Sequence, residues 1–268
     1  PGSSPLRYTN GPYFGSLKLA LPTYDTSKYS FGSTWTAGAA LSLDATYRFA
    51  DNGKIQVLYY NDFGTYYTKV SRNFGVTTAD SVQGGYTDMS SDGNIWCVND
   101  QAGNGYVSVN GGYNMNTVIT GMPMFAGACS VAPDGSSIAF YGDGQPHIWL
   151  ATDYNFTDFK NISVPYSPYF VRFSGDAKCV LGGGTGSDAF MFLSKSSGAN
   201  GTFSNVGLAQ SWYDANIADD CSSVMAVSIT NPYDGKLIRS DNITAYNSTA
   251  SWVTKCGLSG SYVGLGCD

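Results

Sequence analysis

The chain has 268 residues and a formal net charge of −6, and its 20 acidic residues are all aspartate. Because glutamate is absent, chemistry that needs a catalytic Glu is excluded, and the shortage of good helix formers argues against a helical fold. The 14 Lys and Arg residues are scattered singly, which argues against a nucleic-acid partner.

The predicted elements repeat along the chain as strand, aspartate-containing turn and strand. A first group of strands is expected at 1–8, 17–21 and 34–38. The turn aspartates of the following units are about 42 residues apart: Asp51, Asp92, Asp134, Asp176 and Asp220. Third strands are expected from Tyr66, Tyr106, Ile148, Phe190 and Leu237. Fourth strands are expected from Phe74, Thr117, Phe159, Phe203 and Trp252.

Four short strands in about 42 residues are typical of a β-propeller blade. We therefore predict an all-β fold, a single six-bladed β-propeller domain with four-stranded blades. The first blade is expected to be closed by the C-terminal strand, which leaves no free sheet edge. The predicted blades are 258–268 with 1–41, 42–82, 83–122, 123–165, 166–208 and 209–257.

Two short motifs resemble known propeller families. Ala132-P-D-G-S-S-I-A-F resembles the S-P-D-G-x-x-I-A-F repeat of TolB-like propellers. Ala151-T-D-Y-N-F-T-D-F loosely resembles the Asp-box of sialidase-type propellers. The resemblance implies the propeller fold and leaves function open, because such propellers include enzymes, receptors and scaffolds.

Several features predict an extracellular protein. No apolar run approaches the roughly 20 residues that cross a bilayer, so we expect no membrane insertion. Six cysteines without C-x-x-C spacing favour disulfides, and the blade register predicts the pairs Cys97–Cys129, Cys179–Cys221 and Cys256–Cys267. Five N-glycosylation sequons begin at Asn155, Asn161, Asn200, Asn242 and Asn247.

The predicted topology sorts the loops between two ends of the ring. The aspartate turns are expected at one end, where Asp accepts backbone hydrogen bonds and shapes the turn. Aromatic rings among Asn, Asp and Gly at the other end predict a platform for sugars or a tyrosine-rich protein interface, although such rings also pack between blades. The candidate binding residues are Tyr13, Phe14, Phe63, Asp143, His147, Tyr166, Tyr169, Trp212, Tyr213 and Tyr233.

Catalytic chemistry has little support in the sequence. The single histidine, His147, is the one available base for a Ser-His-Asp or Cys-His site, and it has no supporting motif. We predict no catalytic residue, no metal ligand set and no cofactor, with a structural calcium ion in a loop such as 99–105 as the alternative.

The composition and motifs therefore predict a non-catalytic extracellular glycoprotein. It would serve in adhesion or as a building block of a surface coat or filament, with a glycan or protein surface as partner and with self-assembly as a further option. The alternatives are an Asp-based carbohydrate hydrolase or lyase, and a glycan-binding lectin.

Overall fold

The structure is a computed structural model that describes residues 46–51, 53–62, 65–73, 79–80, 85–100, 102–122, 125–153, 155–184, 186, 189–229, 235–240 and 253–258. Within these residues the chain forms 20 β-strands in five four-stranded antiparallel sheets, with no helix. No helix of the described ranges is therefore long and apolar enough to span a membrane.

Each sheet takes its strands from one stretch of the chain. The first sheet contains β1 (Thr46–Phe49), β2 (Gln56–Asp62), β3 (Thr65–Ser71) and β4 (Ala79–Asp80). The second contains β5 (Tyr86–Met89), β6 (Trp96–Asn99), β7 (Gly105–Ser108) and β8 (Asn116–Ile119). The third contains β9 (Phe125–Val131), β10 (Ile138–Asp143), β11 (His147–Ala151) and β12 (Lys160–Ser163). The fourth contains β13 (Phe170–Phe173), β14 (Val180–Gly183), β15 (Met191–Ser194) and β16 (Ser204–Val206). The fifth contains β17 (Trp212–Ile217), β18 (Val224–Ile229), β19 (Gly235–Ser240) and β20 (Val253–Leu258).

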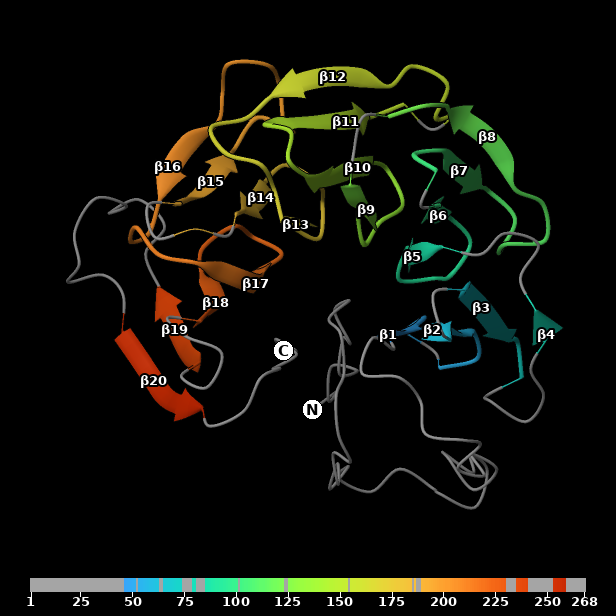
Figure 1. The fold of residues 1–268 in the computed structure, drawn as a ribbon, viewed down its shortest axis with the longest axis horizontal. Helices are drawn as coiled ribbons and strands as arrows, with labels where there is room; N and C mark the ends of the chain where they lie inside the picture. The colour runs from blue at the N-terminus through green and yellow to red at the C-terminus, as the bar shows by residue number, and fades with distance from the viewer. Residues whose placement is uncertain are drawn as a thin grey trace, which may run out of the picture.

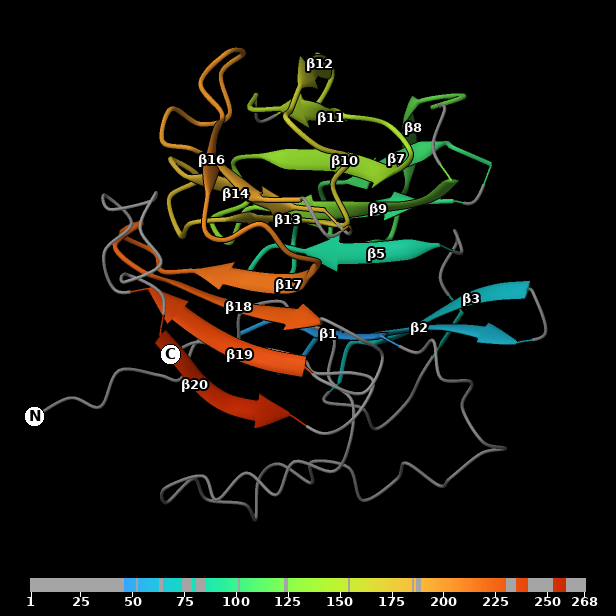
Figure 2. The same ribbon diagram turned by 60° about the vertical axis from the view of Figure 1, so that its left-hand side comes forward.

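The five sheets are arranged as the blades of a β-propeller. In every sheet the strands pair in chain order, with the first strand nearest the common centre and the fourth at the outside (Figure 1). The turned view shows the same outward succession from β17 to β20 (Figure 2). First strands of neighbouring sheets contact one another, as β5 does with β9 and β13 with β17. The predicted sixth blade, 258–268 with 1–41, lies outside the described residues except for Leu258, so the blade count and the closure stay predictions.

The aspartate turns share two features, a hydrogen bond to the aspartate carboxylate and a left-handed residue directly after the aspartate. Four aspartates each accept a hydrogen bond from the backbone N–H two residues later, at 2.9 to 3.1 Å: Asp92, Asp134, Asp176 and Asp220. The next residue then adopts a left-handed φ, for example 75° at Gly135 and 55° at Ala177. The prediction that these aspartates shape the turns is therefore confirmed.

Acidification is expected to weaken the fold through these turns. Hydrogen bonds from Ser222 hold the pKa of Asp220 below its ordinary value of 3.8. At Asp92, partial burial opposes this effect, but hydrogen bonds from Ser90 and Asn94 prevail and lower the pKa. A carboxyl group whose pKa is lower in the folded state stabilises the protein fully above its unfolded pKa, and this contribution is lost as the pH falls through the folded pKa.

Thermal unfolding followed by circular dichroism should therefore show a lower midpoint temperature at about pH 3 than at about pH 5. These two pH values lie on either side of the range in which aspartate carboxyl groups titrate. Asp92→Asn should reduce the difference between the two midpoints, because an amide does not titrate. Equal midpoints for the unsubstituted protein at both pH values would contradict this prediction.

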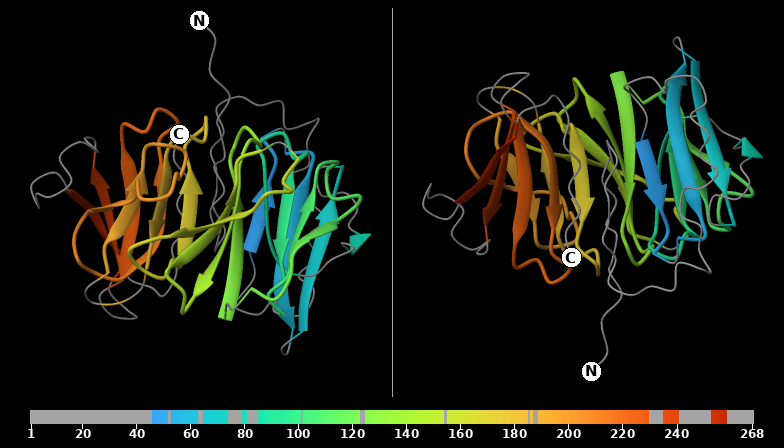
Figure 3. Two further views of the ribbon diagram at one scale, coloured as in Figure 1. Left: turned by 90° about the horizontal axis from the view of Figure 1, so that it is seen from above. Right: turned by 90° about the horizontal axis from the view of Figure 1, so that it is seen from below.

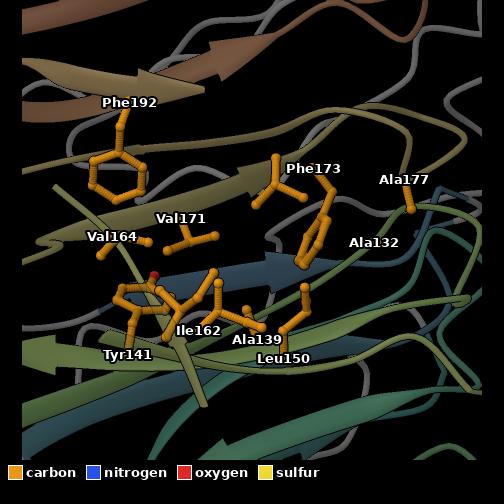
Figure 4. Packing of buried hydrophobic residues seen from close by; sticks show 12 residues of the cluster. Ala132, Ala139, Tyr141, Leu150, Ile162, Val164, Val171, Phe173, Ala177 and Phe192 are labelled. Atoms are coloured by element: carbon orange, nitrogen blue, oxygen red, sulfur yellow. The ribbon is translucent and has the colours of Figure 1, made fainter. Parts of the chain in front are cut away.

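The hydrophobic core lies between neighbouring sheets. Between the third and fourth sheets, Leu150 and Ile162 face Val171 and Phe173 on β13, and all four side chains are buried (Figure 4). An equivalent cluster between the fourth and fifth sheets is built around Trp212. Because neighbouring blades bury their facing sides against each other, the loops at the ends of the strands are the segments that can vary.

Two disulfides tie neighbouring blades together. Cys97–Cys129 joins the second sheet to the third, with Cα atoms 6.2 Å apart. Cys179–Cys221 joins the fourth sheet to the turn that precedes β18, with Cα atoms 6.1 Å apart. Both pairs were predicted and are confirmed. Of the third pair, Cys256 lies in β20 and Cys267 lies outside the described residues.

Candidate functional site

The topology gives the ring two different ends. The strands run between these ends, as the views from above and below show (Figure 3). The connections between first and second strands, which carry the aspartate turns, lie at one end together with those between third and fourth strands. We call this the aspartate end. The connections between second and third strands, and those between successive blades, lie at the other end, which we call the loop end.

Two aromatic side chains meet at the loop end between the fourth and fifth sheets. The rings of Tyr169 and Tyr213 lie with centroids 4.9 Å apart and planes inclined by 46°. The rings of Tyr166 and Phe190 form a separate pair with centroids 6.3 Å apart, and Tyr166 packs against the core between the third and fourth sheets. We call the exposed face of Tyr169 and Tyr213 the tyrosine surface.

Backbone hydrogen bonds hold the segments of this surface together. The N–H of Tyr169 donates to the carbonyl of Gly183 at 2.7 Å, and the N–H of Trp212 donates to the carbonyl of Gly184 at 3.1 Å. The N–H of Gln210 donates to the carbonyl of Ala189 at 2.9 Å. The end of β14 therefore anchors both inter-blade connections, and the segment before β15 fixes Gln210.

Burial separates the residues that can meet a partner from those that cannot. Tyr169 is 43% exposed, and Tyr166, Phe190 and Tyr213 are half-buried. Trp212 is fully buried, so its prediction as a binding residue is wrong. Successive side chains of a strand point to opposite faces, and Trp212 turns into the core, where its indole N–H donates to the carbonyl of Leu208 at 3.0 Å.

Several polar groups lie near the inter-blade connections that carry these rings. The amide nitrogen of Asn205 donates to the Tyr166 hydroxyl at 3.5 Å, and the hydroxyl of Ser211 accepts a hydrogen bond from the N–H of Gly186 at 2.9 Å. The side-chain nitrogen of Gln210 is buried and has no hydrogen-bond partner.

The other predicted binding residues do not join this group. His147 begins β11 on the third sheet, is half-buried, and meets Trp149 edge-on with ring centroids 6.5 Å apart. Its Nδ1 atom is buried without a hydrogen-bond partner. Asp143 ends β10, and its side chain is not described. Four residues lie outside the described part of the chain: Tyr13, Phe14, Phe63 and Tyr233.

Buried ion pairs connect the first strands near the centre of the ring. The Nε of Arg48 on β1 lies 3.1 Å from the Oδ1 of Asp88 on β5, and the Nη2 of Arg172 on β13 lies 2.6 Å from the Oδ1 of Asp214 on β17. The other oxygen of Asp88 accepts a hydrogen bond from the N–H of Val131 at 2.9 Å. These charged groups link neighbouring blades.

The sequence indicated the two arginines of these ion pairs more clearly than their aspartate partners. Arg48 and Arg172 occupy the same position before the aspartate turn, and Asp88 has that position in the second unit. The change from a cation in the first unit to an anion in the second was the signal for Asp88. Asp214 stands two residues earlier than that position on β17, so it lies on the same face of the strand as Asn216. Burial opposes the charge of Arg172, but the carboxylates of Asp214 and Asp88 raise its pKa, so it stays protonated.

The loop that had been considered for calcium is held by hydrogen bonds of its own. One carboxylate oxygen of Asp100 accepts from the N–H of Asn104 at 2.8 Å, and the other accepts from the Asn104 side chain at 3.0 Å and from the Tyr106 hydroxyl at 2.9 Å. Across the described ranges, no three His, Cys, Asp or Glu side chains come together as a set of metal ligands.

Three of the five sequon asparagines belong to the described residues, and all three are exposed. Asn155 and Asn200 lie in connections between third and fourth strands, and Asn161 lies on the outer strand β12. Asn242 and Asn247 lie outside the described residues.

Comparison with known proteins agrees with the fold. No protein-family model matches the sequence, and no curated protein matches it. A GH74 xyloglucanase from Xanthomonas campestris superimposes with a TM-score of 0.59 at 11% identity, over 78% of this chain and 37% of the enzyme. This chain thus spans less than half the length of that enzyme.

Two further solved structures have a similar fold. A putative TolB from Agrobacterium tumefaciens gives a TM-score of 0.55 at 14% identity, over 81% of each chain. YCF48 bound to D1 peptide gives 0.54 at 11% identity, over 82% of this chain and 71% of YCF48. TolB and GH74 proteins are propellers, so the fold and the comparisons agree on a β-propeller. At these identities the likeness shows the fold alone.

Proposed function

We propose that this chain is a non-catalytic, extracellular, N-glycosylated β-propeller that serves in adhesion or as a building block of a surface coat or filament. It binds a glycan or protein surface, or another copy of itself, through the tyrosine surface. The observation that carries the proposal is the pair Tyr169 and Tyr213, two rings 4.9 Å apart at the loop end, of which Tyr169 is 43% exposed. Tyrosine is enriched at binding surfaces because it offers a large apolar ring together with a polar hydroxyl.

The central carboxylates support a non-catalytic role. A general acid or base must reach the substrate with a lone pair or a proton available. One oxygen of Asp214 faces the guanidinium of Arg172, and the other has no hydrogen-bond partner but is buried away from solvent. Both oxygens of Asp88 are occupied by Arg48 and the N–H of Val131. These groups act as links between blades.

The two disulfides and the exposed sequons support an extracellular location. Disulfides form and persist in oxidising compartments, and Asn155, Asn161 and Asn200 are exposed, as a glycan requires. The structure of YCF48 with D1 peptide supports a polypeptide as one class of partner, because it gives an example of this fold with a bound peptide.

Two measurements on the protein purified from its native source test this function. Peptide mass spectrometry with and without glycan removal should find N-glycans on Asn155, Asn161 or Asn200. Negative-stain electron microscopy should show the discs either joined in an assembly or decorating a surface. Unglycosylated, monomeric particles that bind neither cells nor purified surface material would refute the proposal.

The alternative is a carbohydrate-active enzyme, and the likeness to a GH74 xyloglucanase favours it. In that case the protein would hydrolyse xyloglucan or another polysaccharide in a reducing-end assay, and Asp143→Asn would abolish turnover. Absence of product from a polysaccharide panel would leave the binding role in place.

A further inference from the structure

We infer that Asn200–Gly201, in the connection between β15 and β16, is a site of spontaneous modification. In copies of the protein that carry no glycan there, the Asn200 side chain loses ammonia and becomes aspartate or isoaspartate. The inference goes beyond the proposed function and does not depend on it, because it concerns the bare asparagine. Three Asn-Gly pairs belong to the described residues, and their surroundings differ: Asn104–Gly105, Asn110–Gly111 and Asn200–Gly201.

The reaction joins an asparagine side chain to the backbone nitrogen of the next residue. This nitrogen attacks the Cγ atom, a bond from the nitrogen to Cγ forms, and the bond from Cγ to Nδ2 breaks. Ammonia leaves and takes the proton of the attacking nitrogen. Water then opens the cyclic imide at either carbonyl, which gives aspartate or isoaspartate. Glycine favours the attack because it has no Cβ and the widest backbone freedom, whereas a hydrogen bond that holds either reacting group must first open.

Asn200 and Gly201 form the open tip of a tight turn. The N–H of Thr202 donates to the carbonyl of Ala199 at 3.1 Å, so Asn200 and Gly201 are the two central residues of this turn. Both are exposed, and Gly201 has a φ of 75° with no heavy atom beyond its chain neighbours within 4 Å of the position that a Cβ would take. Among the described residues, neither the Asn200 side chain nor the Gly201 N–H has a hydrogen-bond partner. The peptide unit that must react is therefore open to water and held at neither reacting group.

Exposure of the asparagine alone does not decide the reaction, as Asn110–Gly111 shows. Asn110 is also exposed, but its Oδ1 accepts hydrogen bonds from the Ser108 hydroxyl at 2.8 Å and from the N–H of Asn114 at 3.1 Å. Gly111 is buried, and its N–H, which would have to attack, donates to the carbonyl of Asn94 at 2.8 Å. Both reacting groups of this pair are therefore held.

The pair Asn104–Gly105 is held by other partners. The side-chain nitrogen of Asn104 donates to Asp100 at 3.0 Å, and its Oδ1 accepts from the N–H of Gly121 at 3.3 Å. Gly105 is buried at the start of β7, where it pairs with β6. The fold therefore protects these two pairs and leaves Asn200–Gly201 reactive.

Incubation of the folded protein at mildly alkaline pH tests the inference. The whole chain is produced in the bacterial periplasm, where disulfides form and Asn200 receives no glycan. Samples are digested at mildly acidic pH, and mass spectrometry with electron-transfer fragmentation measures asparagine, aspartate and isoaspartate at each pair. We expect Asn200 to convert at least about tenfold faster than Asn110 or Asn104, the factor that corresponds to opening one or two hydrogen bonds before the attack. The matched control is the same protein in urea with a reductant, where all three pairs lose their structure and should convert at similar rates.

Each outcome decides the question. Faster conversion of Asn200 in the folded protein, together with similar rates at the three pairs in urea, supports the inference. Equal rates in the folded protein, or faster conversion of Asn110 or Asn104, overturn it. An equally large preference for Asn200 in urea overturns it as well, because the neighbouring sequence and not the fold would then select the site. None of these results concerns the tyrosine surface, so the proposed function stands or falls separately.

Discussion

Arg172→Leu is expected to lower the free energy of unfolding by about 3–5 kcal/mol, the usual cost of leaving one partner of a buried ion pair alone. The Nη2 atom of Arg172 lies 2.6 Å from the Oδ1 atom of Asp214, and the two side chains are 10% and 3% exposed. Leucine would leave the Asp214 carboxylate buried without its cation between two blades. Urea denaturation followed by tryptophan fluorescence measures the change.

Two further variants separate the buried charge from other effects. The double variant Arg172→Leu/Asp214→Leu should recover most of the lost stability, because replacing a whole buried pair by apolar groups is often neutral. Lys178→Ala is the matched control. The Nζ atom of Lys178 also lies 2.6 Å from a carboxylate oxygen, Oδ2 of Asp176, but these side chains are 74% and 46% exposed. An exposed pair contributes little, so this variant should unfold like the unsubstituted protein. Equal effects of Arg172→Leu and Lys178→Ala would contradict the account of the central ion pairs.

Removal of the Cys179–Cys221 disulfide is expected to cost about 4 kcal/mol, the loop-closure estimate for its sequence separation of 42 residues. The bond joins the fourth blade to the fifth. Without it the unfolded chain gains conformational entropy, whereas the folded chain, held by its other contacts, does not. The suitable variant is Cys179→Ala/Cys221→Gly. Cys221 has a left-handed φ of 60°, which glycine adopts without strain.

The unfolding free energy of this variant, measured in urea, should match that of the unsubstituted protein after selective reduction of the same bond. A loss below about 1 kcal/mol in both measurements would show that the disulfide adds little to the link between these blades. The Cys97–Cys129 bond, with a separation of 32 residues, should give a slightly smaller loss.

Much of the fold could be predicted because the repeat carries its own turn chemistry. Aspartate at one position fixes a turn through a local hydrogen bond, so Asp92, Asp134 and Asp176 locate three blades without knowledge of distant contacts. The same register placed Cys97 beside Cys129. The first and last segments had no comparable turn signal, and the closure of the ring there stays a prediction.

The candidate site was harder to predict because exposure depends on packing between blades. Tyr213 and Trp212 are adjacent, and the sequence does not tell which of them turns outward. The strand irregularity after Trp212, its hydrogen bond to the Leu208 carbonyl and the core between the blades decide it. Phe190 was expected only as the start of a strand, although its place directly after a loop at the same end was a usable signal.

Retention of the protein on cells of its source organism tests the central claim most directly. The unsubstituted protein, Tyr169→Ala/Tyr213→Ala and Tyr113→Ala are incubated with the cells, and the bound fraction is measured after washing. Tyr113→Ala is the matched control, since Tyr113 is 65% exposed but lies in the connection between β7 and β8, at the aspartate end. The account predicts that the unsubstituted protein and Tyr113→Ala stay bound, while the double variant, folded by circular dichroism, is washed away. Full retention of the double variant, or loss of binding only in Tyr113→Ala, would contradict the claim that the tyrosine surface binds the partner.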